Sequence, residues 1–211
     1  EEYAGALNRS RWGLKTPGNE YHAETILDFY PDAKFIQTVR DPRDVAVSFQ
    51  NAKGGSWNYH PGIHIANWRR SVKIAEQLAN RYSDRFLAIR YEDLVLDPAK
   101  TTRSVCQMLN LSYSDELINA LGHLGWKGDN SSFDDIGSDK TQSQISSAAI
   151  GRYHKQLDPY LIFRYQQKLK TELIHWQYQL KPFRTYLRWG YAIKSLVSKS
   201  RHFISSSRRY R

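Results

Sequence analysis

The feature that most constrains the fold is a short apolar run that ends on a charged turn. Residues 34–39, KFIQTV, have the length and character of a buried strand, and Arg40, Asp41 and Pro42 follow at once. Asp41 can cap a helix and proline suits the first helical position, so the sequence predicts a helix from Pro42 to about Asn51. A strand that turns directly into a helix is a unit of α/β architecture.

The same alternation continues along the chain. A second buried strand is predicted over residues 85–91, and Asn19 and Pro31 are expected to cap and to end the first helix. Further helices are predicted over 19–30, 63–82, 98–109, 114–122 and 159–178. Helices that alternate with strands predict a parallel sheet covered on both faces, which is a three-layer α/β/α domain.

Charge divides the chain into two parts. The net charge of +10 invites a nucleic-acid partner, but nine of the 31 basic residues lie in 181–211, where no acidic residue occurs. Residues 1–180 are nearly neutral, so we expect a domain over 1–180, a basic tail over 181–211 and no nucleic-acid partner. The single cysteine, Cys106, excludes an internal disulfide and favours a reducing compartment, so a cytoplasmic location is expected.

The basic tail has an amphipathic pattern. Drawn as a helix, residues 182–199 gather Trp189, Ile193 and Leu196 on one face, with Arg188 opposite. Such a helix suits peripheral contact with an anionic membrane or carbohydrate surface. It equally suits docking on its own domain or a frayed end, and the sequence leaves these alternatives open.

Arg40 is a candidate for binding an anion. It is expected at the carboxyl end of a parallel strand, where α/β proteins bind ligands, and just before a helix N-terminus, whose amides favour anions. Ser48 follows two helical turns later, on the same face as Asp44. The alternative is structural, with Arg40 paired to Asp44 or Asp93 and Ser48 an ordinary helix serine.

Residues 35–49, FIQTVRDPRDVAVSF, strongly resemble the 3′-phosphate-binding segment of sulfotransferases that use 3′-phosphoadenosine 5′-phosphosulfate (PAPS). In that family a strand ends in arginine, a DP-D or NP-D turn follows, and a serine comes eight residues after the arginine. Both residues bind the 3′-phosphate, and they correspond to Arg40 and Ser48 here.

Three further segments resemble the family in order and spacing. Residues 12–17, WGLKTP, resemble the strand that delivers an active-site lysine, which would be Lys15. Residues 89–98, IRYEDLVLDP, resemble the segment whose tyrosine contacts adenine, here Tyr91. Residues 146–157, SSAAIGRYHKQL, resemble the late Gly-x-aromatic segment that closes over the 3′-phosphate, with the candidates Ser146, Ser147, Gly151 and Arg152.

The resemblance implies a P-loop NTPase-like sulfotransferase fold and transfer of a sulfuryl group from PAPS to a hydroxyl or amine. The acceptor would be a small molecule, a carbohydrate or a peptide, and no metal is expected. Lys15 would place positive charge near the bridging oxygen as the bond to sulfur breaks, where negative charge develops on the leaving phosphate.

The chain departs from the family pattern in three ways, one of which is that Ser146 and Ser147 occupy the first two positions of the RKG that cytosolic members have late in the chain. Pro17 stands where cytosolic members have a catalytic histidine, so KTP resembles bacterial members and the protein-tyrosine branch, where an upstream glutamate is the base. No PKSGTTW-like loop for the 5′-phosphosulfate is found, and GGSW at 54–57 follows the 3′-phosphate segment instead of preceding it. We therefore expect the carboxy-terminal portion of a sulfotransferase, in which strands 34–39 and 85–91 lack a neighbour.

Other candidates and rival functions stay open at this point. His22, His60 and His64 are base candidates, and the last two have the spacing of a metal pair without an evident third ligand. Trp57 and Tyr59 are candidates for stacking on an acceptor. The rival functions are a P-loop kinase of a small molecule, whose GxxxxGK[ST] loop the chain lacks, and a non-catalytic basic module that binds membrane or nucleic acid.

Overall fold

Two parallel strands, β1 (Phe35–Val39) and β2 (Phe86–Arg90), form the sheet that lies at the centre of the computed structural model. Their register runs from the pair Phe35 and Phe86 to the pair Val39 and Arg90. The two strands pair directly with each other, and among the described residues neither has a second neighbour, so the expected loss of a neighbouring strand stays a prediction. The structure describes residues 11–51, 60–118, 147–183 and 190.

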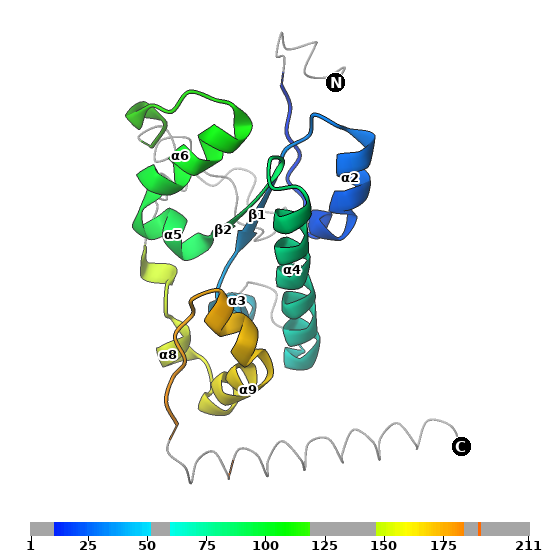
Figure 1. Ribbon diagram of the computed structural model, residues 1–211. Coiled ribbons are helices and arrows are strands. Elements are labelled where there is room, and N and C mark those ends of the chain that lie inside the picture. The colour runs from blue at the N-terminus through cyan, green and yellow to red at the C-terminus, as the bar shows by residue number, and fades with distance from the viewer. Residues whose placement is uncertain (1–10, 52–59, 119–146, 184–189, 191–211) are drawn as a thin grey trace, which may run out of the picture.

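Helices cover the sheet on both sides (Figure 1). The 3-10 helix η1 (Asn19–His22), α2 (Ala23–Phe29) and the long α4 (Pro61–Arg81) lie on one side. On the other side lie α5 (Tyr91–Leu96) and α6 (Pro98–Leu109), which both contact β2. The predicted three-layer arrangement is therefore confirmed.

The remaining elements gather below the carboxyl ends of the strands (Figure 1). They are α3 (Pro42–Asn51), the 3-10 helix η3 (Ser147–Ala149), α8 (Tyr153–Gln156) and α9 (Pro159–His175). Contacts join α3 to α8 and α9, and α4 packs along α9. Because α9 follows α3 by more than a hundred residues, this end of the sheet is built from distant parts of the chain.

Two apolar clusters hold these layers together. One lies where α3, α4 and α9 meet, and its most deeply buried members are Ala46, Val47, Val72, Ile162, Tyr165, Leu169 and Leu173. The other joins α2, α4 and β2 through Ala23, Leu27, Ala75, Leu78, Tyr82 and Phe86. Each cluster buries an apolar helix stripe on a neighbouring element, and this burial is the main stabilising contribution expected for such a domain.

Several predicted helix starts are confirmed and two are wrong, and the last helix ends at His175, earlier than predicted. Pro42 and Pro98 each occupy the first position of a helix, as predicted. Asn19 does not cap the first helix, because that helix begins as a 3-10 turn after Gly18, whose φ of 88° favours glycine. The long helix begins earlier than predicted, at Pro61, since the His60 side chain accepts the backbone N–H of Ile63 and caps it.

The chain beyond α9 continues to pack on the domain as far as Phe183. Tyr178 is buried, and the Phe183 ring packs edge-on against Phe163 with a centroid separation of 5.6 Å. The amphipathic pattern predicted for 182–199 lies almost wholly outside the described residues. None of the helices in the described part of the chain combines the length and the hydropathy that a membrane span requires.

The turn between β1 and α3 carries a buried ion pair. Nε and Nη2 of Arg43 donate to the two carboxylate oxygens of Asp41, at 2.9 and 2.7 Å, and the Arg43 side chain is fully buried. Nη1 of Arg43 donates to Gln166 on α9 at 3.0 Å. The guanidinium also lies 4.1 Å from the ring centroid of Tyr153 on α8. One side chain therefore joins the turn to both later helices.

The Asp41 end of this pair is bonded to the start of α5, the helix that follows the neighbouring strand. The backbone N–H of Asp41 donates to Oε1 of Glu92 at 3.0 Å, and the Tyr178 hydroxyl donates to Oε2 of Glu92 at 3.1 Å. Burial raises the pKa of Glu92, and the hydrogen bonds it accepts oppose that rise. The Asp-Pro turn, the start of α5 and the segment after α9 thus share one polar network.

Arg43→Ala is expected to lower the free energy of unfolding by about 3–5 kcal/mol, because it leaves the Asp41 carboxylate buried without its cation. The measurement is urea unfolding followed by circular dichroism. Arg81→Ala is the matched control, since Arg81 forms an exposed pair with Glu24 and should change stability by less than about 1 kcal/mol. Equal losses for the two variants would contradict the assigned role of Arg43.

Candidate active site

Arg40 and Tyr91 lie side by side at the carboxyl edge of the sheet. Val39 and Arg90 are the last paired residues of β1 and β2, so Arg40 and Tyr91 are the first residues beyond each strand. The Arg40 guanidinium lies 4.3 Å from the centroid of the Tyr91 ring. Parallel strands bring these two motifs together although fifty residues separate them.

Arg40 does not form an ion pair with Asp44 or Asp93, which the structural alternative predicted. Its Nη2 donates to the carbonyl of Ala149 at 2.8 Å, and its own carbonyl accepts the indole N–H of Trp68 at 2.9 Å. Asp93 pairs with Arg90 instead, at 3.3 Å. Nε of Arg40 is buried and has no hydrogen-bond partner among the described residues, so a donor of the guanidinium remains for a ligand.

Asp44 holds the late glycine segment against α3. Its Oδ2 accepts the N–H of Gly151 at 2.6 Å, and its Oδ1 accepts the N–H of Tyr153 at 2.9 Å. Gly151 has φ of 71°, a conformation that favours glycine. Burial raises the pKa of Asp44, and the two N–H groups oppose that rise. The sequence analysis did not identify this contact.

Ser48 lies on the α3 face that looks toward the late segment. Asp44, Ser48 and Asn51 follow one another at helical spacing, so they share a face. Asp44 binds Gly151, and Asn51 donates to Gln156 at 2.9 Å, so both ends of this face contact residues 151–156. Ser48 sits between them with its side chain exposed, and no described residue bonds its hydroxyl.

The remaining candidates of residues 146–157 differ in their burial and in how they are placed relative to Arg40. Arg152 lies between the two N–H groups that Asp44 accepts, and its Nε is buried with no described hydrogen-bond partner. Ser147 begins η3 and is exposed, and Ser146 lies outside the described residues. GGSW, Trp57 and Tyr59 also lie outside them.

Lys15 is not brought to this cluster by any described contact. Residues 11–16 form no regular secondary structure, so the strand expected over WGLKTP is wrong, and the Lys15 side chain is exposed. A strand needs a neighbour to bond its backbone groups, and the described part of the sheet consists of β1 and β2 alone. The assignment of Lys15 as the catalytic cation stays a prediction.

The three histidine candidates have separate environments. His22 ends η1 and is exposed, and His60 caps α4. His64 is part-buried, and its Nδ1 lies 2.5 Å from the hydroxyl of the fully buried Tyr165. Burial lowers the pKa of His64 to about 4, so it is neutral at pH 7 and a weak base.

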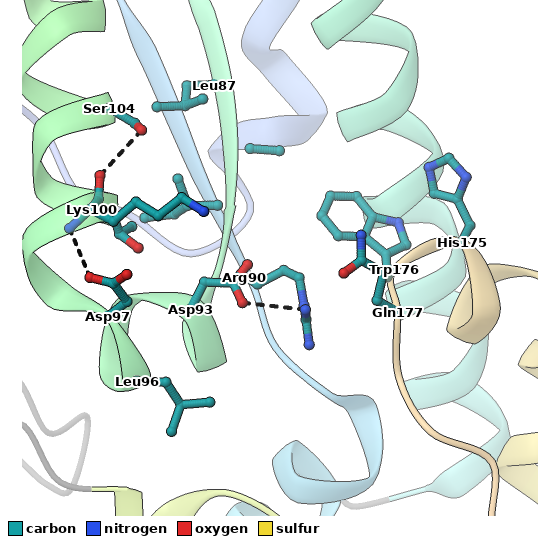
Figure 2. A pocket seen from close by; sticks show the side chains of 13 residues that line it. Leu87, Arg90, Asp93, Leu96, Asp97, Lys100, Ser104, His175, Trp176 and Gln177 are labelled. Atoms are coloured by element: carbon teal, nitrogen blue, oxygen red, sulfur yellow. Dashed lines mark hydrogen bonds and ion pairs between the residues drawn. The ribbon is translucent and has the colours of Figure 1, made fainter.

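A cavity of about 470 Å³ lies beside β2, on the side of α6 (Figure 2). Figure 2 shows Lys100 and Trp176 facing it from opposite walls, with Arg90 between them. None of the predicted site residues lines this cavity. Arg90, which lines the cavity, also has a buried Nε without a described hydrogen-bond partner, and its Nη1 pairs with Asp93. We assign the site to the strand ends instead, because Arg40 and Tyr91 contact each other there and Arg40 bonds the segment that contains Gly151 and Arg152.

The arrangement at the strand ends suits an anion. Arg40 supplies a guanidinium with a free buried donor, and the first turn of α3 supplies the positive end of a helix. Tyr91 adds an aromatic surface beside the guanidinium. Ser48 adds an exposed hydroxyl from the face that looks toward Gly151. These groups together can bind a phosphate and contact a ring attached to it.

Comparison with known proteins gives one family. Residues 1–115 match the model described as Sulfotransferase family. The chain is 28% identical over 97 residues to Protein-tyrosine sulfotransferase 1 of Danio rerio, which covers 44% of the chain and 27% of that protein. It is also 28% identical over 113 residues to Omega-hydroxy-beta-dihydromenaquinone-9 sulfotransferase Stf3 of Mycobacterium tuberculosis (strain CDC 1551 / Oshkosh), which covers 46% and 28%. The chain thus spans less than a third of the length of each relative.

A solved structure supports the same fold. The "Sulfotransferase Domain from the Curacin Biosynthetic Pathway" matches with a TM-score of 0.54 and 21% sequence identity, over 79% of this chain and 62% of that chain. The predicted P-loop NTPase-like sulfotransferase fold is therefore confirmed at the level of architecture.

Acidification is expected to destabilise the protein through His64. With the pKa near 4 in the folded state and 6.5 unfolded, the unfolded chain binds more protons between these values, so stability falls as pH drops through this window. The loss from pH 7 to pH 4.5 should be roughly 2 kcal/mol smaller in His64→Gln. His22→Gln, at an exposed site, should show the wild-type loss. Identical acid losses in wild type and His64→Gln, measured by urea unfolding at each pH, would contradict the burial of His64.

Proposed function

Because the chain belongs to the sulfotransferase family, we propose that it forms the nucleotide-binding part of an enzyme that transfers a sulfuryl group from PAPS to a hydroxyl or amine. The observation that carries the proposal is the convergence of Arg40, Tyr91 and residues 149–151 at the carboxyl ends of β1 and β2. These are three of the motifs that the sequence analysis connected with the donor nucleotide.

The 3′-phosphate of the donor is assigned to Arg40 and Ser48. Arg40 has the planar donor set that matches phosphate oxygens, and its buried Nε has no described partner that a ligand would have to displace. Ser48 adds a hydroxyl donor from α3, and Gly151 and Arg152 lie across from that helix. A phosphate in this position would also meet the N-terminal amides of α3.

The adenine ring is assigned to Tyr91. An aromatic ring beside a guanidinium can stack on a base while the cation binds the attached phosphate. The Arg40 guanidinium and the Tyr91 ring are 4.3 Å apart, so one nucleotide can contact both groups. PAPS supplies the activated sulfuryl group, and these residues bind and orient the nucleotide that carries it.

Lys15 is proposed as the cation that stabilises charge on the leaving phosphate, and Lys15 lies within the matched residues 1–115. The acceptor is proposed only as a class, because the two relatives carry different acceptors in their names, a protein tyrosine and a hydroxylated menaquinone. Family membership favours this function over the P-loop kinase. Peripheral membrane contact through 181–211 remains a separate proposal.

Arg40→Ala is expected to weaken the binding of adenosine 3′,5′-bisphosphate by roughly tenfold to 150-fold, the value of a charge-assisted hydrogen bond. The binding of AMP, which lacks the 3′-phosphate, should change far less. Isothermal titration calorimetry measures both affinities. Arg103→Ala is the control, since Arg103 forms an exposed pair with Asp115 on the surface. A similar loss for both nucleotides would refute the 3′-phosphate assignment.

Lys15→Ala is expected to lower kcat more than it raises the KM for PAPS in the full-length enzyme. The positive charge is needed most in the transition state, when the leaving phosphate gains charge. Single-turnover sulfate transfer from labelled PAPS measures the chemical step directly. Lys34→Ala is the control, because Lys34 bonds the carbonyl of Asp84 at the far end of β1. A wild-type rate for Lys15→Ala would assign Lys15 to the surface.

A further inference from the structure

We propose that Asp44 is a positioning residue of the anion site, which sets the place of residues 147–153 opposite Arg40 by binding their backbone. The inference rests on the proposed function, because the site that Asp44 organises is the one assigned to the 3′-phosphate. It gives a role to Asp44, the last carboxylate of the DP-D turn, to which the sequence analysis assigned no role in ligand binding.

Both oxygens of the Asp44 carboxylate are committed to the late segment. One accepts the N–H of Gly151 at 2.6 Å and the other accepts the N–H of Tyr153 at 2.9 Å. Asp44 is 1% exposed, so these bonds form away from water, where charge-assisted hydrogen bonds are strong. An ordinary helix cap binds amides of its own helix, whereas Asp44 binds amides more than a hundred residues away.

The residues flanking these two amides are the ones that meet the site. Ala149, two residues before Gly151, accepts from Nη2 of Arg40 at 2.8 Å. Arg152 lies between the two bound amides and has a buried Nε without a described partner. A shift of the segment away from α3 would therefore move both Ala149 and Arg152 relative to Arg40.

The local secondary structure of the segment would not hold it in place by itself. Residues 153–156 form a single short helix, too short to be stable without tertiary contacts. The Tyr153 side chain is held by the Arg43 guanidinium, 4.1 Å from its ring centroid. Asp44 and Arg43 are neighbours in sequence, so one turn of α3 holds the backbone and the ring of the same residue. Arg43 contacts the ring of Tyr153, whereas Asp44 fixes the backbone on both sides of Arg152.

The test compares Asp44→Asn with wild type. Asparagine has the same shape but a single acceptor oxygen, and its NH₂ group would face an N–H donor, so one of the two bonds is lost. Binding of adenosine 3′,5′-bisphosphate should weaken at least about tenfold, while binding of AMP should change less than about twofold. Asp158→Asn is the matched control: Asp158 also accepts two backbone N–H groups, from Tyr160 and Leu161, but at the cap of α9.

Hydrogen exchange measured by NMR provides a second readout that a general loss of stability would not reproduce. In Asp44→Asn the amides of Gly151 and Tyr153 should exchange faster, while that of Val39 in β1 should keep its wild-type rate. Faster exchange with unchanged bisphosphate affinity would overturn the positioning role alone. Equal weakening of bisphosphate and AMP would also overturn it. A wild-type protein that binds no bisphosphate would instead refute the proposed function, and with it the role of Asp44 in that site.

Discussion

The buried ion pair of Asp41 and Arg43 is the interaction on which the arrangement of the strand ends depends. A buried pair of this kind adds little net stability compared with an apolar one, but it tolerates few alternative positions, because each unmet charge would be costly. Its partners Gln166 and Tyr153 come from the last third of the chain. The pair therefore fixes where α8 and α9 meet α3, and Arg40 and Asp44, on either side of it in sequence, are placed as a consequence.

Much of the fold could be predicted from local sequence signals. The strand over 35–39, the helix that begins at Pro42 and the second strand over 86–90 each carry strong patterns, and the structure has all three. The direct pairing of the two strands could not be predicted, because register and neighbours depend on contacts across the sheet. The first helix begins as a 3-10 turn at Asn19 because Gly18 has a positive φ, and a single glycine in the sequence does not predict such a start.

The site could be predicted in part, for a similar reason. Arg40 and Tyr91 each follow a strand, and parallel strands end at the same edge, so their proximity follows from topology. Arg40 could be assigned to a ligand from its place at the strand end, but no local pattern predicted that Arg43, in the same turn, is fully buried. The role of Asp44 depends on the backbone of residues 151–153, which no local pattern reveals. The available signal was the place of Asp44 at the end of the DP-D turn.

The central claim is that the motif after β1, the motif after β2 and the late glycine segment form one anion site. An NMR titration of the isotope-labelled chain with adenosine 3′,5′-bisphosphate tests it most directly. We expect saturable chemical-shift changes, at a common dissociation constant, for the amides of Arg40, Ser48, Tyr91 and Gly151, with little change in α6. Shifts confined to the cavity beside β2, around Lys100 and Trp176, would contradict it.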